Sequence, residues 1–345
     1  MNLLRTSGRS LRGRALRAAA AALILAAAAA AWCADVPRAA AAPTGFHEVT
    51  DFGPNPGNLT MYAYVPESAR PGAPVVVLFH GCGGDARDLD VNTGWRKYAD
   101  TYGFTIVFPE QKEENVGSGG LIPHKCFSAW SEEDRTRAGD GEARSVVRMV
   151  EHMTEAYGAD ASRVFVTGYS GGGAATNVML AAYPDVFKAG AVFFGMAYGC
   201  ADSESVYFVT PPFGPCSGYF NFTSAREWGD RLRGAHPGYS GPRPPVQIWH
   251  GGSDPIIVPR SLEYQTAQWT NVFGIGRTPT STTTPASGVT KRVYGSGRLE
   301  TYLIDDMGHE PPVDPGAGAE NCGTAGAGHD ALCGPYHASR FFGLG

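Results

Sequence analysis

The segment with the clearest chemical potential is a glycine-rich turn around Ser170. Residues 168–172 have the pattern Gly-x-Ser-x-Gly, with an apolar run before them and a small-residue run at 172–182 after them. A strand that turns sharply into a helix strains the central serine and exposes its hydroxyl, and glycines without a Cβ allow the close crossing. A phosphate-binding loop would require a Lys-Ser or Lys-Thr pair after the glycines, and none follows. The pattern predicts that Ser170 is a nucleophile.

A serine hydroxyl is a weak nucleophile at neutral pH, so a general base must remove its proton. Serine hydrolases built on such a turn place serine, acid and histidine in that chain order. His309 and Asp254 each come soon after an apolar run predicted to be a strand, and strand ends carry active residues in this kind of fold. His250 also ends a predicted strand, but it precedes Asp254. We therefore expect Asp254 to orient His309, and His309 to act as the base.

The tetrahedral intermediate of acyl transfer needs two hydrogen-bond donors for its oxyanion. The backbone amide of Gly171, directly after the nucleophile, is one expected donor. The glycine-rich loop 80–84 follows an early apolar run and resembles the oxyanion loop of lipases. The amide of Cys82 is therefore the second expected donor. This chemistry requires no cofactor and no metal ion.

Short, wholly apolar runs alternate along the chain with helical patterns. Such runs are typical of strands buried on both faces of a parallel sheet, and the alternation predicts a doubly wound α/β fold. The predicted strands are 74–79, 105–108, 164–166, 191–194, 246–249 and 301–304, and the predicted helices are 142–157, 172–182 and 261–272. Residues 278–290 are rich in Thr, Ser and Pro, but a further apparent strand follows, so we expect a loop within one domain covering residues 43–345.

The first 42 residues have the layout of a secretory signal peptide. A basic start is followed by an apolar stretch of about 15 residues, which is short for a membrane span, and then by small residues up to Ala42. Cys33 raises the alternative of a lipoprotein, but the preceding Trp32 is bulky where a small residue is expected. A retained helical anchor is a further alternative. We expect residues 1–42 to be removed, and the mature protein to be secreted, monomeric and without stable membrane association.

The charge balance excludes one class of partner. The whole chain carries a formal charge of −5, and 18% of its residues are charged. Residues 1–42 hold six Arg and one acid, so the remaining 303 residues carry 22 basic and 32 acidic side chains, or about −10. A nucleic-acid-binding protein would need a basic surface instead. No nucleic-acid partner is expected.

Six of the seven cysteines follow the predicted signal peptide, and an exported protein is expected to pair them. Six cysteines allow 15 pairings. Proximity along the chain favours Cys200–Cys216 and Cys322–Cys333, which leaves Cys82–Cys126. A rival interpretation takes Cys322, His329, Cys333 and His337 as zinc ligands, because their spacing loosely resembles that of a zinc site.

Taken together, these motifs resemble the secreted esterases of carbohydrate esterase family one, which act on acetylxylan or feruloyl esters and are related to extracellular poly(3-hydroxybutyrate) depolymerases. The resemblance covers most of residues 45–345. It rests on the loop at 80–84, the tracts 126–142 and 159–195, and the segments 227–230, 238–241, 249–259, 267–274 and 308–316. It implies an α/β-hydrolase fold, a triad of Ser170, Asp254 and His309, oxyanion donors at Cys82 and Gly171, and a Cys82–Cys126 bridge.

The sequence departs from the family at two places. Gly171 stands where relatives often have Ala or Ser, and residues 126–130 replace an aromatic Cys-Trp-Asn-Trp segment that helps to shape the substrate surface. We expect a serine esterase that releases acetyl or feruloyl groups from a plant-wall polysaccharide such as xylan. A polyester depolymerase is the first alternative, and an acyltransferase is the second. Trp130 and Trp228 could contact either polymer or could lie in the core.

Overall fold

The computed structural model describes residues 43–115 and 125–345, so the predicted signal peptide at 1–42 lies outside it. In the described part of the chain, ten strands form one sheet in the order β1-β2-β4-β3-β5-β6-β7-β10-β9-β8. The central strands are parallel: β4 (Thr105–Glu110), β3 (Val75–Phe79), β5 (Val164–Tyr169), β6 (Ala189–Phe193), β7 (Val246–Gly251) and β10 (Leu299–Ile304). Antiparallel strands extend both edges: β1 (Gly45–Val49) and β2 (Thr60–Val65) on one side, β9 (Val289–Tyr294) and β8 (Ser281–Thr283) on the other.

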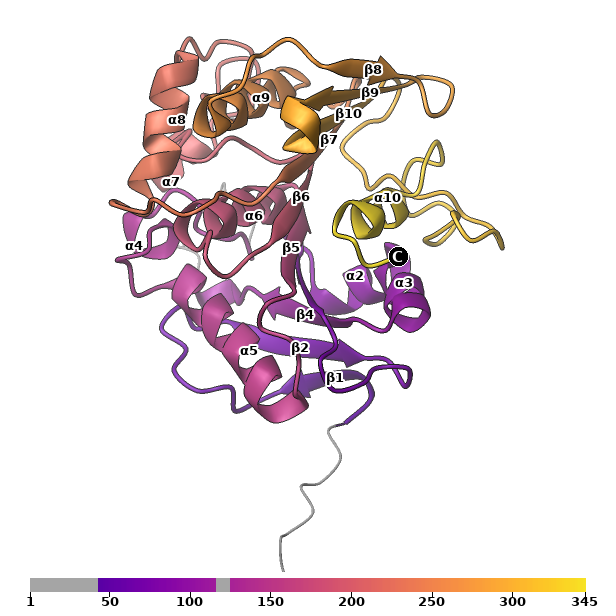
Figure 1. Cartoon of the computed structure of the whole chain (residues 1–345). Coiled ribbons are helices and arrows are strands. Elements are labelled where there is room, and N and C mark those ends of the chain that lie inside the picture. The colour runs from indigo at the N-terminus through magenta and orange to yellow at the C-terminus, as the bar shows by residue number, and fades with distance from the viewer. Residues whose placement is uncertain (1–42, 116–124) are drawn as a thin grey trace, which may run out of the picture. The chain divides into compact units, whose positions relative to one another are not determined.

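Helices cover both faces of this sheet (Figure 1). One face carries α5 (Glu142–Tyr157), α6 (Gly171–Ala182) and α9 (Arg260–Phe273), with α8 (Ala225–Gly234) packed on α9; the other carries α2 (Ala86–Asn92), α3 (Trp95–Tyr102) and α10 (Gly334–Phe341). The short helices α4 (Glu132–Arg135) and α7 (Glu204–Tyr207) lie in connections, as do the 3-10 turns Glu113–Asn115 and Gly295–Gly297. Residues 43–345 form one compact unit.

The central strands are buried because each of them supplies side chains to two cores. On β3, Val75, Val77 and Phe79 pack in the core beneath α5 and α6, whereas Val76 and Leu78 pack in the core beneath α3 and α10. Side chains of a strand alternate between faces, so a strand covered by helices on both sides must be apolar at every position. This explains why the apolar runs in the sequence mark the parallel strands.

The predicted fold class is confirmed, and the predicted strands and helices each overlap an observed element. The antiparallel strands at the two edges were not predicted. β1, β8 and β9 lack continuous apolar runs, whereas β2 (TMYAYV) contains one that was not assigned to a strand. The expectation of a loop at 278–290 is wrong in part: β8 lies within it and β9 begins in it. The side chains of Ser281–Thr283 are exposed, so β8 depends on backbone pairing with β9 rather than on apolar burial.

All six cysteines of this unit are paired in the structure, as Cys82–Cys126, Cys200–Cys216 and Cys322–Cys333. The last pair uses both sulfurs of the alternative zinc site, so those atoms are not free to bind a metal. Within residues 43–115 and 125–345, no cluster of three or more His, Cys, Asp or Glu side chains is arranged to hold a metal ion. No helix in those ranges is long and apolar enough to cross a membrane.

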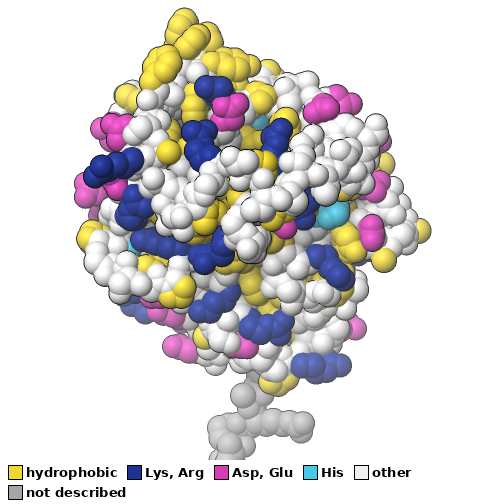
Figure 2. All heavy atoms as spheres, turned by 45° about the horizontal axis from the view of Figure 1, so that its top comes forward, with side chains coloured by type: hydrophobic (Ala, Val, Ile, Leu, Met, Phe, Trp, Pro, Cys, Tyr) yellow, Lys and Arg dark blue, Asp and Glu magenta, His cyan; other side chains and the backbone are white. Residues whose placement is uncertain are grey.

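Charged side chains of both signs are interspersed over the face shown in Figure 2, and hydrophobic side chains protrude at its upper edge. No single sign of charge covers this face. Such a surface does not generate the strong one-signed field that draws polyanions to a protein.

One aromatic contact joins the two strands that precede Asp254 and His309. Trp249 of β7 stacks on Tyr302 of β10, with ring centroids 3.7 Å apart and planes 7° from parallel. The indole N–H of Trp249 donates to Gln247, and both aromatic side chains are buried. The stack thus holds β7 and β10 together directly before the loops that carry Asp254 and His309.

We expect Trp249→Ala to lower the free energy of unfolding by about 3–5 kcal/mol, because it leaves a large cavity in a close-packed core. Trp249→Phe should cost less, since it keeps an aromatic ring against Tyr302. Urea denaturation followed by circular dichroism measures both values. A loss below about 1 kcal/mol for the alanine variant would contradict the importance of this stack.

Candidate active site

Ser170 lies at the turn between β5 and α6 in a strained backbone conformation. Its φ is 56° and its ψ is −118°, a backbone conformation that residues other than glycine rarely adopt. Its amide donates to the carbonyl of Phe193 at the end of β6, at 3.0 Å, and its carbonyl accepts from Ala174. These bonds hold the strained turn, and the Ser170 side chain is partly exposed.

The glycines around Ser170 allow the turn to press against the end of β3. A Cβ placed on Gly168 would lie 2.4 Å from the carbonyl oxygen of Gly172 and 2.8 Å from Cβ of Phe79. A Cβ on Gly172 would lie 2.4 Å from the carbonyl oxygen of His80. Any larger residue would force the two segments apart. The glycines therefore determine how close the 80–84 loop comes to Ser170.

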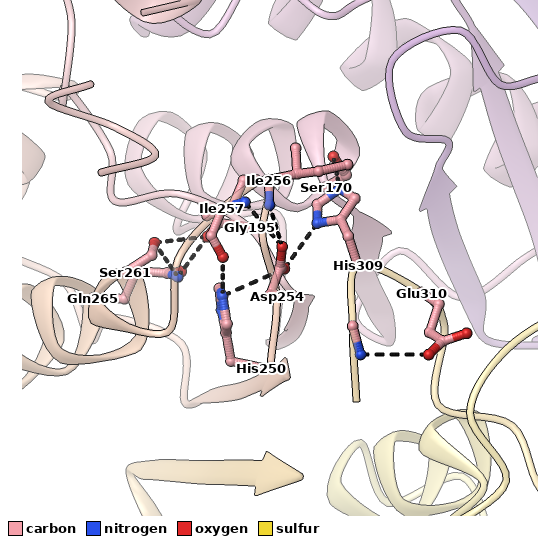
Figure 3. A network of polar contacts seen from close by, with 11 residues as sticks. Ser170, Gly195, His250, Asp254, Ile256, Ile257, Ser261, Gln265, His309 and Glu310 are labelled. Atoms are coloured by element: carbon pink, nitrogen blue, oxygen red, sulfur yellow. Dashed lines mark hydrogen bonds and ion pairs between the residues drawn. The ribbon is translucent and has the colours of Figure 1, made fainter. Parts of the chain in front are cut away.

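Ser170, His309 and Asp254 form a continuous chain of hydrogen bonds (Figure 3). The Ser170 hydroxyl lies 2.8 Å from Nε2 of His309, and Nδ1 of His309 lies 2.8 Å from Oδ2 of Asp254. With Nδ1–H donating to the carboxylate, Nε2 is free to accept the serine proton. The structure thus brings together the three residues that the sequence singled out.

The Asp254 carboxylate is held in its ionised form. Burial by itself would raise its pKa, but the hydrogen bond from His309, the charge of that ring and the amide of Ile257 outweigh burial and lower the pKa below 3.8. Its Oδ1 accepts the backbone N–H groups of Ile256 and Ile257, both at 2.9 Å. Asp254 is therefore a charged acceptor that orients His309 across the neutral pH range.

His250, which is not expected to be the base because it precedes Asp254, supports the turn at residues 254–257. Its Nε2 lies 2.7 Å from the carbonyl oxygen of Ile257 and 3.6 Å from Oδ2 of Asp254. Its side chain is fully buried, and burial lowers its pKa. A neutral ring that donates to Ile257 holds the turn whose amides bind Asp254.

Phe194, which directly follows β6, contacts the ring of His309, and no motif in the sequence indicates this contact. Its ring meets the His309 ring edge to face at 4.7 Å, and its φ is 36°. Its amide donates to the carbonyl of Trp249 at 2.7 Å. A positive φ and a ring contact between distant residues become visible only in the folded structure, so the sequence alone could not indicate this role of Phe194.

The amides of Cys82 and Gly171 lie on two segments that meet at Ser170. A Cβ on Gly81 would lie 3.3 Å from Cβ of Ser170, and one on Gly171 would lie 3.5 Å from the amide nitrogen of Cys82. Neither amide donates to a backbone acceptor in the turns and loops of residues 43–115 and 125–345. Two N–H groups without such acceptors beside a nucleophile can receive a developing oxyanion.

The buried side chain of His80 orients the peptide that carries the Cys82 amide. Its Nε2 accepts the N–H of Gln111 at 3.0 Å, so its proton is on Nδ1, which donates to the carbonyl of Gly81 at 2.7 Å. Burial lowers the pKa of His80 and favours this neutral form. The Gly81 carbonyl and the Cys82 amide belong to one planar peptide, so fixing the oxygen directs the N–H the opposite way.

A second buried group, Glu142 at the start of α5, fixes the loop on the other side of the disulfide. Its carboxyl group accepts from the side chain of Gln111 and from the backbone amide of Ser128, the latter at 2.8 Å, and the side-chain nitrogen of Gln111 also lies 3.4 Å from the carbonyl oxygen of Cys126. Burial, with repulsion from Asp134, raises the pKa of Glu142 to about 8 despite these hydrogen bonds. Position in the sequence gave no indication of this role.

Ser170 and His309 open into a pocket of about 540 Å³ with a largely apolar lining. Two stretches of the chain supply most of the lining, one with Tyr207, Phe208, Val209, Thr210 and Pro211 and the other with Pro255, Ile256 and Ile257, and Met196, Cys82 and Ser217 also line the pocket. Apolar walls around a hydrogen-bonded Ser–His pair suit an uncharged ester, because a charged substrate would lose hydration without compensation.

The two tryptophans proposed as substrate contacts lie elsewhere. Trp228 of α8 is 0% exposed, and Arg231 covers its ring at 4.9 Å, so the prediction of a substrate contact is wrong for this residue. Trp130 is buried behind the pocket wall, against the rings of Tyr207 and Phe208 at 4.8 and 5.3 Å. Both tryptophans belong to one hydrophobic core cluster, so the alternative that they are core residues holds.

A doubly wound sheet with this turn and these three side chains defines a serine esterase of the α/β-hydrolase class. Comparison with known proteins agrees: the family profile described as "Esterase PHB depolymerase" matches residues 59–209. The chain belongs to this esterase family and is a carboxylic-ester hydrolase.

The individual relatives carry three different names. The chain is 41% identical over 303 residues to poly(3-hydroxyalkanoate) depolymerase C of Paucimonas lemoignei, a match covering 86% of this chain and 70% of that one. It is 39% identical to an acetylxylan esterase of Coprinopsis cinerea, covering 80% and 72%. It is 37% identical to feruloyl esterase B of Thermothelomyces thermophilus, covering 80% and 92%. Among solved structures, an acetyl xylan esterase from Aspergillus awamori superposes with a TM-score of 0.70 at 28% identity, covering 87% of this chain and 100% of that one.

We expect His80→Ala to lower kcat by about 10- to 100-fold with a small change in KM, because the Cys82 amide would no longer be aimed at the oxyanion. His80→Asn, whose side-chain amide can take the place of Nδ1, should recover part of the loss. Steady-state kinetics on a soluble ester provide the test, with thermal unfolding as the check on folding. Equal effects on kcat and KM, or no recovery by Asn, would indicate a merely structural role.

We expect Glu142→Gln to change how stability depends on pH. The raised pKa means that between about pH 4.5 and pH 8 the folded state keeps a proton that the unfolded state has released, so the wild-type free energy of unfolding falls as pH rises. The Gln variant does not titrate there, so its free energy of unfolding should stay constant while the wild-type value falls by up to about 5 kcal/mol across that range. Gln has one acceptor oxygen for two N–H donors, so the pH dependence, and not the absolute stability, is the quantity compared. Denaturation curves at several pH values measure it, with the exposed Glu155→Gln on the same helix as control. Parallel pH profiles for wild type and Glu142→Gln would contradict the expectation.

Proposed function

We propose that this chain is an exported serine esterase in which Ser170 is the nucleophile, His309 the general base and Asp254 the residue that orients the imidazole. The observation that carries the proposal is the unbroken hydrogen-bond chain from Asp254 through His309 to Ser170, which ends in an apolar pocket.

The proposed reaction has two halves. Ser170 Oγ attacks the ester carbonyl while its proton passes to Nε2 of His309, and the amides of Cys82 and Gly171 receive the oxyanion. The intermediate collapses when His309 returns the proton to the leaving alcohol, which leaves an acyl group on Ser170. Water then attacks this acyl-enzyme, with His309 again as base, and the acid is released. Asp254 stays ionised throughout, in keeping with its lowered pKa.

The first proposed substrate is an acetyl or feruloyl ester on a plant-wall polysaccharide such as xylan. It is supported by the relatives named acetylxylan esterase and feruloyl esterase, at 39% and 37% identity. The solved acetyl xylan esterase shares the fold over its whole length.

A second proposed substrate is an aliphatic polyester of the poly(3-hydroxyalkanoate) class. The relative at 41% identity is named as a depolymerase of such a polymer. Exposed phenylalanines at 213, 220 and 222, in a segment of which residues 207–211 line the pocket, are a separate observation that favours a water-insoluble substrate.

Export is part of the proposal, with residues 1–42 as a signal peptide and residues 43–345 as the catalytic domain. The three disulfides support it, because such bonds form and persist in oxidising compartments.

We expect Ser170→Ala to lower kcat on a soluble p-nitrophenyl ester by about 10⁴-fold or more, since the serine and histidine act as one unit. The exposed Ser162→Ala, just before β5, is the matched control and should retain full activity. The wild type and both variants are then assayed on acetylated xylan, methyl ferulate and a poly(3-hydroxybutyrate) suspension. Full activity of Ser170→Ala would refute the mechanism, whereas clearing of the polyester without acetate or ferulate release would assign the second substrate.

A further inference from the structure

The structure contains a second open cleft, of about 670 Å³, on the face of the sheet that carries α2. We call it the α2 cleft. It is lined by side chains of β1, β2 and α2, by the loop before α2 and by the end of β4, and none of the described residues lines both this cleft and the catalytic pocket. Three of its lining side chains are apolar or aromatic and six are polar or charged. This composition differs from the largely apolar catalytic pocket and indicates a different ligand.

An aromatic pair on the two edge strands supplies part of the apolar lining. The rings of Phe46 on β1 and Tyr62 on β2 stack with centroids 5.3 Å apart and planes 12° from parallel. Both side chains are half-buried, and the guanidinium group of Arg87 lies over the Phe46 ring at 4.6 Å. Val91 on α2 is 53% exposed and lines the same cleft. The cleft therefore offers a ligand carbon surface as well as polar atoms.

Two carboxylates of the cleft are held in place and keep unused acceptor capacity. Asp85 caps the start of α2 with one oxygen, which accepts the amide of Asp88 at 2.8 Å. One oxygen of Glu110 accepts the amide of Ala86 at 2.8 Å, and the other lies 3.2 Å from Nζ of Lys125. A carboxylate has about four lone-pair sites, so both groups can accept further hydrogen bonds without losing those that hold the loop.

Hydrogen-bond donors line the same cleft. Within residues 43–115 and 125–345, the Tyr62 hydroxyl has no hydrogen-bond partner, and the Lys125 ammonium, which has three N–H groups, bonds only to Glu110. Burial raises the pKa of Tyr62, and so do nearby carboxylates, first among them Glu110, so the phenol keeps its proton and can donate. A complementary ligand must therefore accept hydrogen bonds from these groups and also donate to the carboxylates.

The formal charges of the cleft nearly balance. The lining includes the acids Asp85, Asp88 and Glu110 and the bases Arg87 and Lys125. An anionic ligand would meet more carboxylates than cations, and a polyester, which has no donors, would take water from those carboxylates without replacing its hydrogen bonds. A sugar hydroxyl donates and accepts at once, and the C–H face of a sugar ring can lie on an aromatic surface. The complementary ligand is therefore a neutral sugar.

The cleft lies beside the oxyanion loop. Cys82 lines the catalytic pocket and Asp85 lines the cleft, and three residues span at most about 11 Å. The amide of Gly83 donates to the carbonyl of Lys125 at 3.4 Å, and Cys126, the next residue, is bonded to Cys82. The two sites therefore share one disulfide-closed frame, and a polymer chain held in the cleft passes close to the catalytic pocket.

We infer that the α2 cleft is a non-catalytic binding site for a neutral sugar residue of a polysaccharide chain. The inference rests on the proposed function in taking the attacked material to be a polysaccharide, and it deepens that proposal by giving the sugar backbone a place of its own. Tyr62 and Val91 contact the face of the sugar ring. Asp85, Glu110 and Lys125 bond to its hydroxyl groups.

The experiment measures binding without turnover. Xylohexaose contains no ester bond, so the protein does not consume it, and isothermal titration calorimetry gives its dissociation constant. We expect Tyr62→Ala to weaken binding by about tenfold, because it removes a ring contact and a donor. Lys125→Met keeps the aliphatic stem without the ammonium and should weaken binding by about threefold to tenfold. Lys112→Met, outside the cleft, is the matched control and should bind like wild type.

A conservative replacement separates the ring contact from the hydrogen bond and guards against misfolding. Tyr62→Phe keeps the stack on Phe46, so its thermal unfolding should stay near the wild-type value. It loses the hydroxyl alone and should bind xylohexaose about threefold more weakly than wild type, between wild type and Tyr62→Ala.

Four results would overturn the inference. They are the absence of xylohexaose binding to wild type at millimolar concentration, wild-type affinity in both Tyr62→Phe and Lys125→Met, tighter binding of an oligogalacturonide, and displacement of xylohexaose by oligomers of 3-hydroxybutyrate. The third would make the cleft an anion site, and the fourth would make it part of a polyester path. Failure of the proposed function is a different result, namely soluble-ester hydrolysis that persists in Ser170→Ala, and it does not affect the calorimetric measurement.

Discussion

The arrangement of this site depends on the close approach of two backbone segments, the end of β3 and the turn at Ser170. Glycines at 168 and 172 leave carbonyl oxygens of Gly172 and His80 where a Cβ would otherwise lie. That approach puts the Cys82 amide beside Ser170, and it also places the first residues of α6 over the sheet. If a Cβ at either glycine pushed the segments apart by the width of a methyl group, the nucleophile and the expected oxyanion donors would no longer face the same point.

Polar groups buried behind this contact keep it in register. His80 holds the peptide before Cys82, Glu142 holds the chain around Cys126, and Gln111 bonds to both side chains, so one connected network fixes the two ends of the disulfide. Burying a carboxyl group is costly, as the raised pKa of Glu142 shows. The protein therefore tolerates an unfavourable group in its core where that group defines the geometry of a loop.

The central strands and the three reactive side chains could be predicted from sequence because their signals are local. Continuous apolar runs indicate doubly covered strands, and chain order with strand ends indicated Asp254 and His309. The supports of the site could not be predicted in this way. His80 meets Gln111, and Glu142 meets Ser128, only after distant segments pack, and the burial of Trp228 depends on α8 lying against α9. Exposed edge strands such as β8 were missed because their stability comes from backbone pairing, which leaves no mark in hydrophobicity.

The reactive residues follow β5, β7 and β10, whereas most of the exposed large hydrophobic side chains of the described residues lie in the long connection between β6 and β7, which supplies no reactive residue. The reactive residues and the exposed apolar surface are therefore supplied by separate segments of one chain. A connection of this kind can be lengthened, shortened or exchanged for that of a relative while the strands that deliver serine, acid and histidine keep their register. Members of one family can in this way keep a common reaction and diverge in the material they attack.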